Sequence, residues 1–107
     1  MKTPGPLPAG WIALDNEGNS QLNDEIASEA VPGHPLYGEP FRSVARGIGS
    51  DDVIVELSPK IAGAWAIVHP TYQVETDPRW PSIDRYDTWE QMVEAANAMA
   101  EGWDTGE

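Results

Sequence analysis

The stretch DDVIVELSPKIAGAWAIVHP, residues 51–70, decides the fold. It holds two apolar runs, residues 53–57 and 64–69, whose β-branched and aromatic side chains favour strands. Residues 58–63, which separate the runs, are short enough to close a hairpin. We therefore predict two adjacent antiparallel strands at the centre of the chain.

Further strand signals lie on either side of this hairpin. Residues 41–46, which are followed by glycines at positions 47 and 49, are predicted to form a third strand. This strand would complete an antiparallel meander. The run WIAL, residues 11–14, predicts a short extra strand or a segment packed onto the core. The stretch DPRWPSIDRY, residues 77–86, is expected to be irregular because its prolines interrupt strand pairing.

The first of two predicted helices precedes the strands. It is expected to begin near Ser20, a favoured N-cap residue, and to run to about Ala30, where the sequence Val-Pro-Gly follows. Leu22, Ile26 and Ala30 recur every four residues, which indicates a buried stripe. Three acidic residues are expected on the outer face of this helix: Asp24, Glu25 and Glu29.

The second predicted helix follows the strands. It is expected to open at Asp87, with Glu90 at the spacing of a capping box. Its apolar face comprises Trp89, Met92, Val93, Ala96 and either Met99 or Ala100. The predicted fold is α+β: a three-stranded antiparallel meander covered on one face by an N-terminal and a C-terminal helix, with the short strand at 11–14 as an addition.

Length and composition predict one domain in a 107-residue chain. Residues 1–10, with three prolines and two glycines, are expected to form a flexible arm, and residues 11–107 the α+β domain. Cysteine is absent, which excludes disulfides, thiolate nucleophiles and cysteine-based zinc sites. No apolar run has the length of a signal peptide or a membrane span, so a cytoplasmic protein is expected.

The charges are unevenly distributed. Eighteen acidic residues face six basic ones, for a net charge of −12, and no basic residue lies between Lys2 and Arg42 or after Arg85. Both predicted helices are therefore uniformly negative. Such a field attracts a basic partner and repels nucleic acid and anionic membranes. Solubility and a halophilic habitat remain alternative explanations of the acidity.

Catalytic motifs are weak in this chain. Its serines lie in no Gly-x-Ser-x-Gly motif, and GIGS at residues 47–50 lacks the lysine and helix of a phosphate-binding loop. In the predicted hairpin, His69 ends one strand close to Asp51 and Asp52, where a His–Asp contact could support an enzyme or a metal site. A structural histidine is the favoured interpretation of His69. The sequence assigns no role to His34, which could also act in acid–base chemistry near neutral pH. We expect no enzyme activity and no cofactor.

The motifs GHPLYG (33–38), SVAR (43–46), DDVIVEL (51–57), WAIVHPTY (65–72) and DPRWPSIDRY (77–86) occur in order. In these motifs the chain resembles a family of small uncharacterised bacterial proteins, over residues 11 to about 95. The resemblance implies a compact α+β domain and assigns neither an activity nor a functional residue. In size, charge and fold class such proteins are similar in character to immunity proteins, which neutralise bacterial toxins.

These observations predict a non-enzymatic acidic protein that neutralises a basic protein partner, most plausibly as a toxin immunity protein. Seven residues are expected to bind the partner: Glu25, Glu29, Glu90 and Glu94 through charge, and Tyr37, Tyr72 and Trp80 as aromatic anchors. Two alternatives remain open. One is a phage-type inhibitor that mimics nucleic acid to block a restriction or CRISPR complex, and the other is an enzyme or metal site at His69 with Asp51 or Asp52. The sequence sets no oligomeric state.

Overall fold

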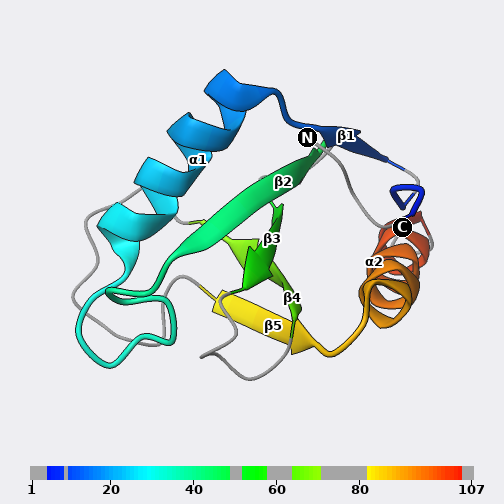
Figure 1. Ribbon diagram of the computed structural model, residues 1–107. Coiled ribbons are helices and arrows are strands. Elements are labelled where there is room, and N and C mark those ends of the chain that lie inside the picture. The colour runs from blue at the N-terminus through cyan, green and yellow to red at the C-terminus, as the bar shows by residue number, and fades with distance from the viewer. Residues whose placement is uncertain (1–4, 9, 49–51, 58–63, 71–81, 105–107) are drawn as a thin grey trace.

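The computed structural model describes residues 5–8, 10–48, 52–57, 64–70 and 82–104. In chain order the elements are β1 (Trp11–Ala13), α1 (Asn16–Glu29), β2 (Phe41–Gly47), β3 (Val53–Leu57), β4 (Trp65–His69), β5 (Ser82–Tyr86) and α2 (Trp89–Asp104). The strands form one antiparallel sheet in the order β1-β2-β3-β4-β5, with α1 and α2 at its sides (Figure 1). The α+β class is therefore confirmed.

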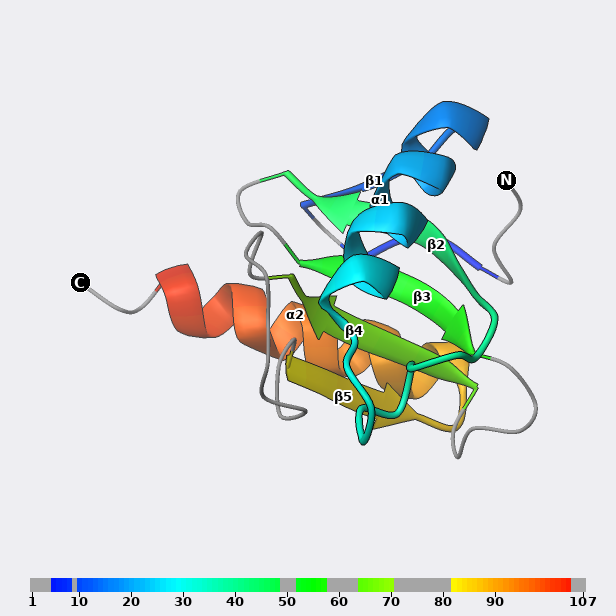
Figure 2. The ribbon, with the colours of Figure 1, turned by 90° about the vertical axis from the view of Figure 1, so that its left-hand side faces the viewer.

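The two helices lie on opposite faces of the sheet, so the expectation that one face is covered is wrong. Figure 2, which has α1 toward the reader, shows α2 behind the sheet. The central strands explain this arrangement, since VIV in β3 and WAIV in β4 are buried at every position. Strands that are apolar on both faces need cover on both sides.

Alternation along the strands divides the buried side chains between two cores. The core on the α2 side contains Trp11, Val44, Ala45, Ile54, Trp65, Ile67, Trp89, Met92 and Ala96. The core on the α1 side contains Ile26, Ala30, Leu36, Val53, Val55, Leu57, Ala66 and Val68. The predicted stripe of α1 is confirmed, because Ile26 and Ala30 are buried and Leu22 packs against them.

The sheet has five strands where the meander was predicted to have three. β3 has the predicted bounds, β2 and β4 differ by one residue, and β1 forms where a short strand was expected. The additional strand is β5, which pairs with β4 from Trp65↔Tyr86 to His69↔Ser82. Its sequence, SIDRY, carries polar residues at three of five positions, as suits an edge strand, so its apolar pattern is weak.

Both helix starts differ from the prediction. Asp15 is the N-cap of α1, where its Oδ1 accepts a hydrogen bond of 2.7 Å from the Gly18 amide, so Ser20 lies inside the helix. In α2, Thr88 Oγ1 accepts from the Gln91 amide and Gln91 Oε1 accepts from the Asp87 amide, each at 3.1 Å. This cap lies one residue later than the predicted pair of Asp87 and Glu90. The described helices contain no span long and apolar enough to cross a membrane.

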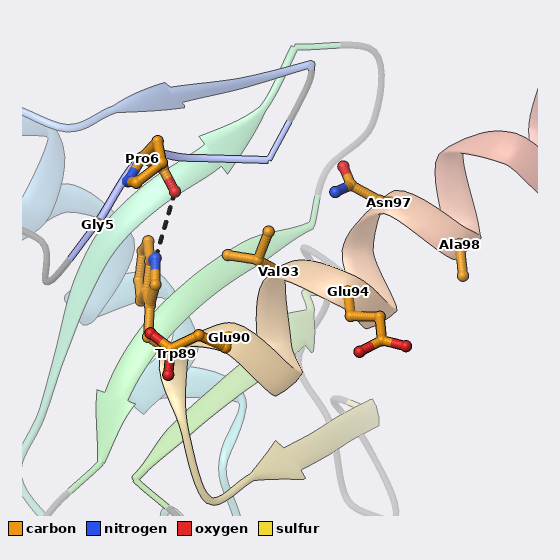
Figure 3. Close-up of a pocket in the computed structure, with 8 residues that line it drawn as sticks. All are labelled: Gly5, Pro6, Trp89, Glu90, Val93, Glu94, Asn97 and Ala98. Carbon is orange, nitrogen blue, oxygen red and sulfur yellow. Dashed lines mark hydrogen bonds between the residues drawn. The ribbon is translucent and has the colours of Figure 1, made fainter.

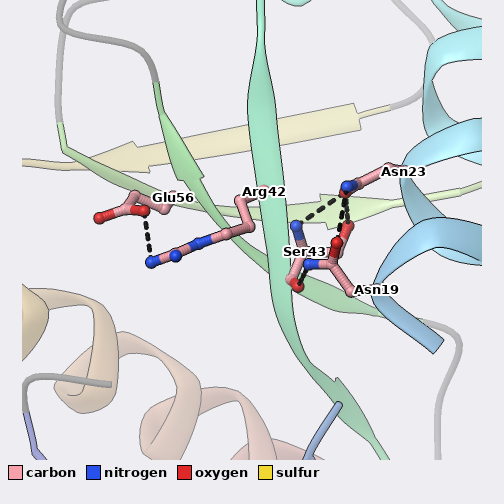
Figure 4. Close-up of polar contacts among 5 residues, drawn as sticks. All are labelled: Asn19, Asn23, Arg42, Ser43 and Glu56. Atoms are coloured by element: carbon pink, nitrogen blue, oxygen red, sulfur yellow. Dashed lines mark hydrogen bonds and ion pairs between the residues drawn. The ribbon is translucent and has the colours of Figure 1, made fainter. Parts of the chain in front are cut away.

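A polar cluster joins α1 to β2 beside an irregularity in the sheet. The β2–β3 register shifts between Ser43 and Ala45. Asn23 Oδ1 accepts from the Ser43 amide at 2.8 Å and from its hydroxyl at 2.7 Å, and Asn19 Nδ2 donates to the Ser43 carbonyl (Figure 4). Asn23 Nδ2 also donates to Asn19 Oδ1 at 3.0 Å. These bonds satisfy the polar groups of Ser43, which is fully buried.

The described part of the N-terminal segment packs against α2. Pro6 O accepts a hydrogen bond of 3.2 Å from Trp89 Nε1, and Leu7 packs against the core on the α2 side. Trp89 in turn meets Trp65 edge-on, with ring centroids 4.8 Å apart. Residues 1–4 and 9 lie outside the described residues. The division into an arm of residues 1–10 and a domain of residues 11–107 stays a prediction.

Candidate functional site

A groove of about 610 Å³ runs between α2 and the N-terminal segment. We call it the α2 groove (Figure 3). Its volume lies within the range of ligand sites in proteins, which is roughly 300–1,000 Å³. It is lined by Gly5, Pro6, Trp89, Glu90, Val93, Glu94, Asn97 and Ala98.

The helical repeat of α2 places the lining residues in two rows. Trp89, Val93 and Asn97 follow one another at intervals of four residues and rise toward the N-terminal segment (Figure 3). The adjacent row consists of Glu90, Glu94 and Ala98, of which Glu94 and Ala98 point away from that segment (Figure 3). One side of the groove is thus largely apolar and the other carries two carboxylates.

The opposite side of the groove depends on a close backbone approach. A Cβ atom added to Gly5 would lie 3.3 Å from Trp89 Nε1, a tight contact. Glycine at this position lets the chain pass over the indole, and the bond from Trp89 to the Pro6 carbonyl holds it there. The groove therefore forms from residues that are 83 positions apart in the sequence.

Glu90 and Glu94 are the two predicted partner-binding residues that border this groove. Both are exposed, and within the described part of the chain neither forms an ion pair. They lie one helical turn apart, where like charges repel each other. Helix α2 contains no basic residue that could relieve this repulsion.

The acidic residues of α1 are arranged differently. Glu29 is 0% exposed, so the expectation that it lies on the outer face of the helix is wrong. It follows Ile26 by three residues and precedes Ala30, which places it on the buried stripe. A fully buried side chain does not reach a partner without rearrangement, so the burial of Glu29 counts against its predicted role in partner binding.

Glu25 is half-buried and hydrogen-bonds to Glu29. The pKa of Glu25 is raised above its ordinary value, first by this hydrogen bond, then by burial and by the charge of Glu29. The pair is thus engaged within the fold. It lies on α1, across the sheet from Glu90 and Glu94 (Figures 1 and 2), so the structure does not bring the four acidic residues together.

The predicted aromatic anchors are only partly described. Tyr37, in the loop after α1, is 54% exposed and is available for contact. Tyr72 and Trp80 lie outside the described residues. The same loop contains His34, which is buried and whose Nδ1 accepts a hydrogen bond of 3.1 Å from the Leu36 amide. This contact ties the His34 ring to the backbone of its own loop.

A second polar cluster joins three strands at one end of the sheet. His69 Nδ1 contacts Asp52 Oδ1, a contact that the predicted hairpin makes possible, and His69 Nε2 lies 3.7 Å from Asp84 Oδ2 on β5. Asp52 is only 7% exposed, whereas His69 and Asp84 are accessible to solvent. Asp84 also contributes, after burial, to a raised pKa of Tyr86.

This cluster can fix the orientation of the imidazole, because a carboxylate faces each ring nitrogen. Among the described residues, no group of three such side chains could hold a metal ion. Asp51 lies outside the described residues. The enzyme hypothesis stays a prediction, which an activity abolished by His69→Ala would support.

Six of the eight residues that line the α2 groove were not predicted as functional. Trp89 and Val93 were expected only on the apolar face of the helix, and no role was expected for Gly5, Pro6, Asn97 and Ala98. The helical spacing of Asn97 and Ala98 after Val93 and Glu94 is visible in the sequence. The sequence does not show that the N-terminal segment packs against these residues of α2, since residues 1–10 were expected to form a flexible arm.

No protein-family model, curated protein or solved structure matches this chain. The resemblance to small bacterial proteins and the immunity-like character therefore stay predictions.

Proposed function

We propose that the protein binds a basic protein partner and occludes its functional surface, as an immunity protein does with a toxin. The observation that carries this proposal is the α2 face, where exposed Glu90 and Glu94, without ion pairs within the described chain, border a groove with apolar walls. Interfaces commonly combine apolar contact area with charged groups that set orientation and specificity. The proposed compartment is the cytoplasm.

The charge of the whole chain supports the same function. With a net charge of −12, the protein presents a negative field that speeds the encounter with a positively charged partner. Both helices lack basic residues and form the outer layers of the fold. Neither helix therefore presents a positive charge to a partner.

Mimicry of nucleic acid is less well supported by this arrangement. A mimic needs a long row of negative charges on one surface, but α1 and α2 lie on opposite faces of the sheet (Figures 1 and 2). On α2 the row through Glu90 and Glu94 continues with Ala98. Two carboxylates in a row suit a local ion pair better than a copy of a phosphate backbone.

The salt dependence of association tests the proposal. We would capture the partner from host extract at low salt, purify it, and measure its association rate between about 20 and 500 mM NaCl. If charge steers the encounter, the rate should fall at least about tenfold over this range. A rate that stays flat would contradict the proposal. Displacement of the partner by DNA or RNA would instead favour the mimic.

A further inference from the structure

We infer that the α2 groove binds an arginine-bearing, partly apolar segment of the protein partner. In this arrangement the arginine stem lies along Val93 and Pro6, and its guanidinium lies between Glu90 and Glu94. The inference rests on the proposed function, which it deepens by naming the surface and the chemistry of its ligand.

The dimensions of the groove fit a peptide segment. The lining residues of α2 run from Trp89 to Ala98, nine residue steps that cover about 13 Å along the helix axis. An extended chain advances about 3.3 Å per residue, so about four residues of a partner lie along this length. A volume of about 610 Å³ accommodates side chains from such a segment.

The chemistry of the lining selects the ligand. Val93, Pro6 and Ala98 offer apolar contact above the buried Trp89, and Glu90 and Glu94 offer two carboxylates one turn apart. A complementary side chain needs an apolar stem and a positive end. Arginine has both, and its planar group donates in a fork that matches carboxylates better than the point charge of lysine.

In the free protein, the negative charges of Glu90 and Glu94 favour the binding of a cation. Glu90 and Glu94 repel each other across one turn, and α2 has no basic residue nearby. A guanidinium placed between them would remove this repulsion. By contrast, the exposed Arg42 on β2 already pairs with Glu56 at 2.6 Å (Figure 4), so that carboxylate is neutralised within the fold.

The test uses the full chain and a defined probe, the peptide acetyl-Leu-Arg-Ala-Leu-Arg-amide. Amide and indole N–H shifts in two-dimensional NMR would report where it binds. The indole of Trp89 is the most informative signal because it donates to Pro6 O at the groove. We expect saturable shifts at Trp89, Val93 and Asn97, with a lysine-substituted peptide binding more weakly.

Two variants address the groove and one serves as the matched control. Glu90→Gln with Glu94→Gln should weaken peptide binding at least tenfold. Ala98→Arg should weaken it likewise, because the new arginine follows Glu94 by one turn and occupies the groove. Glu17→Gln with Asp24→Asn removes the same charge from exposed positions of α1, and should change binding less than twofold.

Each contrary result has a definite meaning. If the α1 control weakens peptide binding as much as the groove variants do, the inference that the groove binds the peptide is wrong. The peptide would then be attracted only by the overall negative charge of the protein. Absence of shifts at α2 up to about 5 mM peptide would also overturn it, and equal binding of the lysine peptide would overturn the choice of arginine. The captured partner distinguishes the two proposals. If its association rate falls steeply with salt but is unchanged by the groove variants, the α2 groove is refuted and the proposed function stands. If the association rate does not change with salt, the proposed function is refuted.

Discussion

Acidic side chains of the same type have different roles in this protein, depending on where each residue lies on its helix. Glu90 and Glu94 are exposed on α2, whereas Glu29 is completely buried on α1 and Glu25 hydrogen-bonds to it. The sequence could have indicated the burial of Glu29, because it lies on the stripe that includes Ile26. The acidic character of this helix concealed the signal, since Glu29 shares the charge of its exposed neighbour Asp24.

Glu25→Gln is expected to stabilise the fold near pH 7. The folded state raises the pKa of Glu25 above the ordinary value of 4.5, so the folded protein binds this proton more tightly than the unfolded chain. In the wild type, the free energy of unfolding therefore rises as the pH falls from the raised pKa toward the ordinary value. Glutamine resembles the protonated form and should be more stable than the wild type at pH 7.

Thermal unfolding of both proteins at pH 7 and at about pH 4 checks this prediction. The variant should melt higher at pH 7, and the difference should become small at the lower pH, where the wild-type carboxyl is protonated in both states. Asp24→Asn, at the exposed neighbouring position, is the control and should show little difference at either pH. A lower melting temperature of Glu25→Gln at pH 7 would contradict the assignment.

At the scale of elements, the local sequence pattern located most helices and strands. The capped helix starts and the edge strand were harder to recognise. The apolar stripe of α1 begins at Leu22, but the helix begins at Asn16 because Asp15 caps a polar first turn. The edge strand β5 was missed for a related reason, since it buries little and alternates weakly. Periodicity detects buried faces and therefore does not detect polar turns or solvated edges.

The docking of α1 on β2 gives a prediction for Asn23. Asn23→Ala removes the acceptor of both the amide and the hydroxyl of buried Ser43. Buried donors without acceptors cost about 1–3 kcal/mol, so the free energy of unfolding should fall by that amount. Urea denaturation measures it. Asp24→Ala, the exposed neighbour, should change the value by less than about 0.5 kcal/mol, and equal effects of the two variants would show that the polar cluster does not stabilise the fold.

The charge of the whole molecule acts on its stability as well as on its partners. A chain of net charge −12 with negative helices on both faces repels itself in the compact state. Salt screens this repulsion, because the Debye length falls from about 30 Å at 0.01 M to about 8 Å at 0.15 M. The self-repulsion is thus separable from partner binding by experiment.

We expect the melting temperature to rise by a few degrees between about 10 and 200 mM NaCl. The fourfold variant with neutral residues in place of Glu17, Asp24, Glu90 and Glu94 should rise less. A melting temperature that falls with salt would show that attractive pairs such as Arg42–Glu56 outweigh the repulsion. A fold that requires molar salt would favour the halophilic explanation of the acidity.

The sequence by itself determined the central strands, the buried stripe of α1 and the negative sign of both helices, and it predicted that His69 ends its strand close to Asp51 and Asp52. These features follow from spacing within a few residues or from a single hairpin, so local pattern suffices. Only the tertiary structure decided which sheet face each helix covers and that residues 5 and 6 close a groove on α2. Those features depend on contacts between distant residues, such as the bond from Trp89 to Pro6, which local periodicity does not encode.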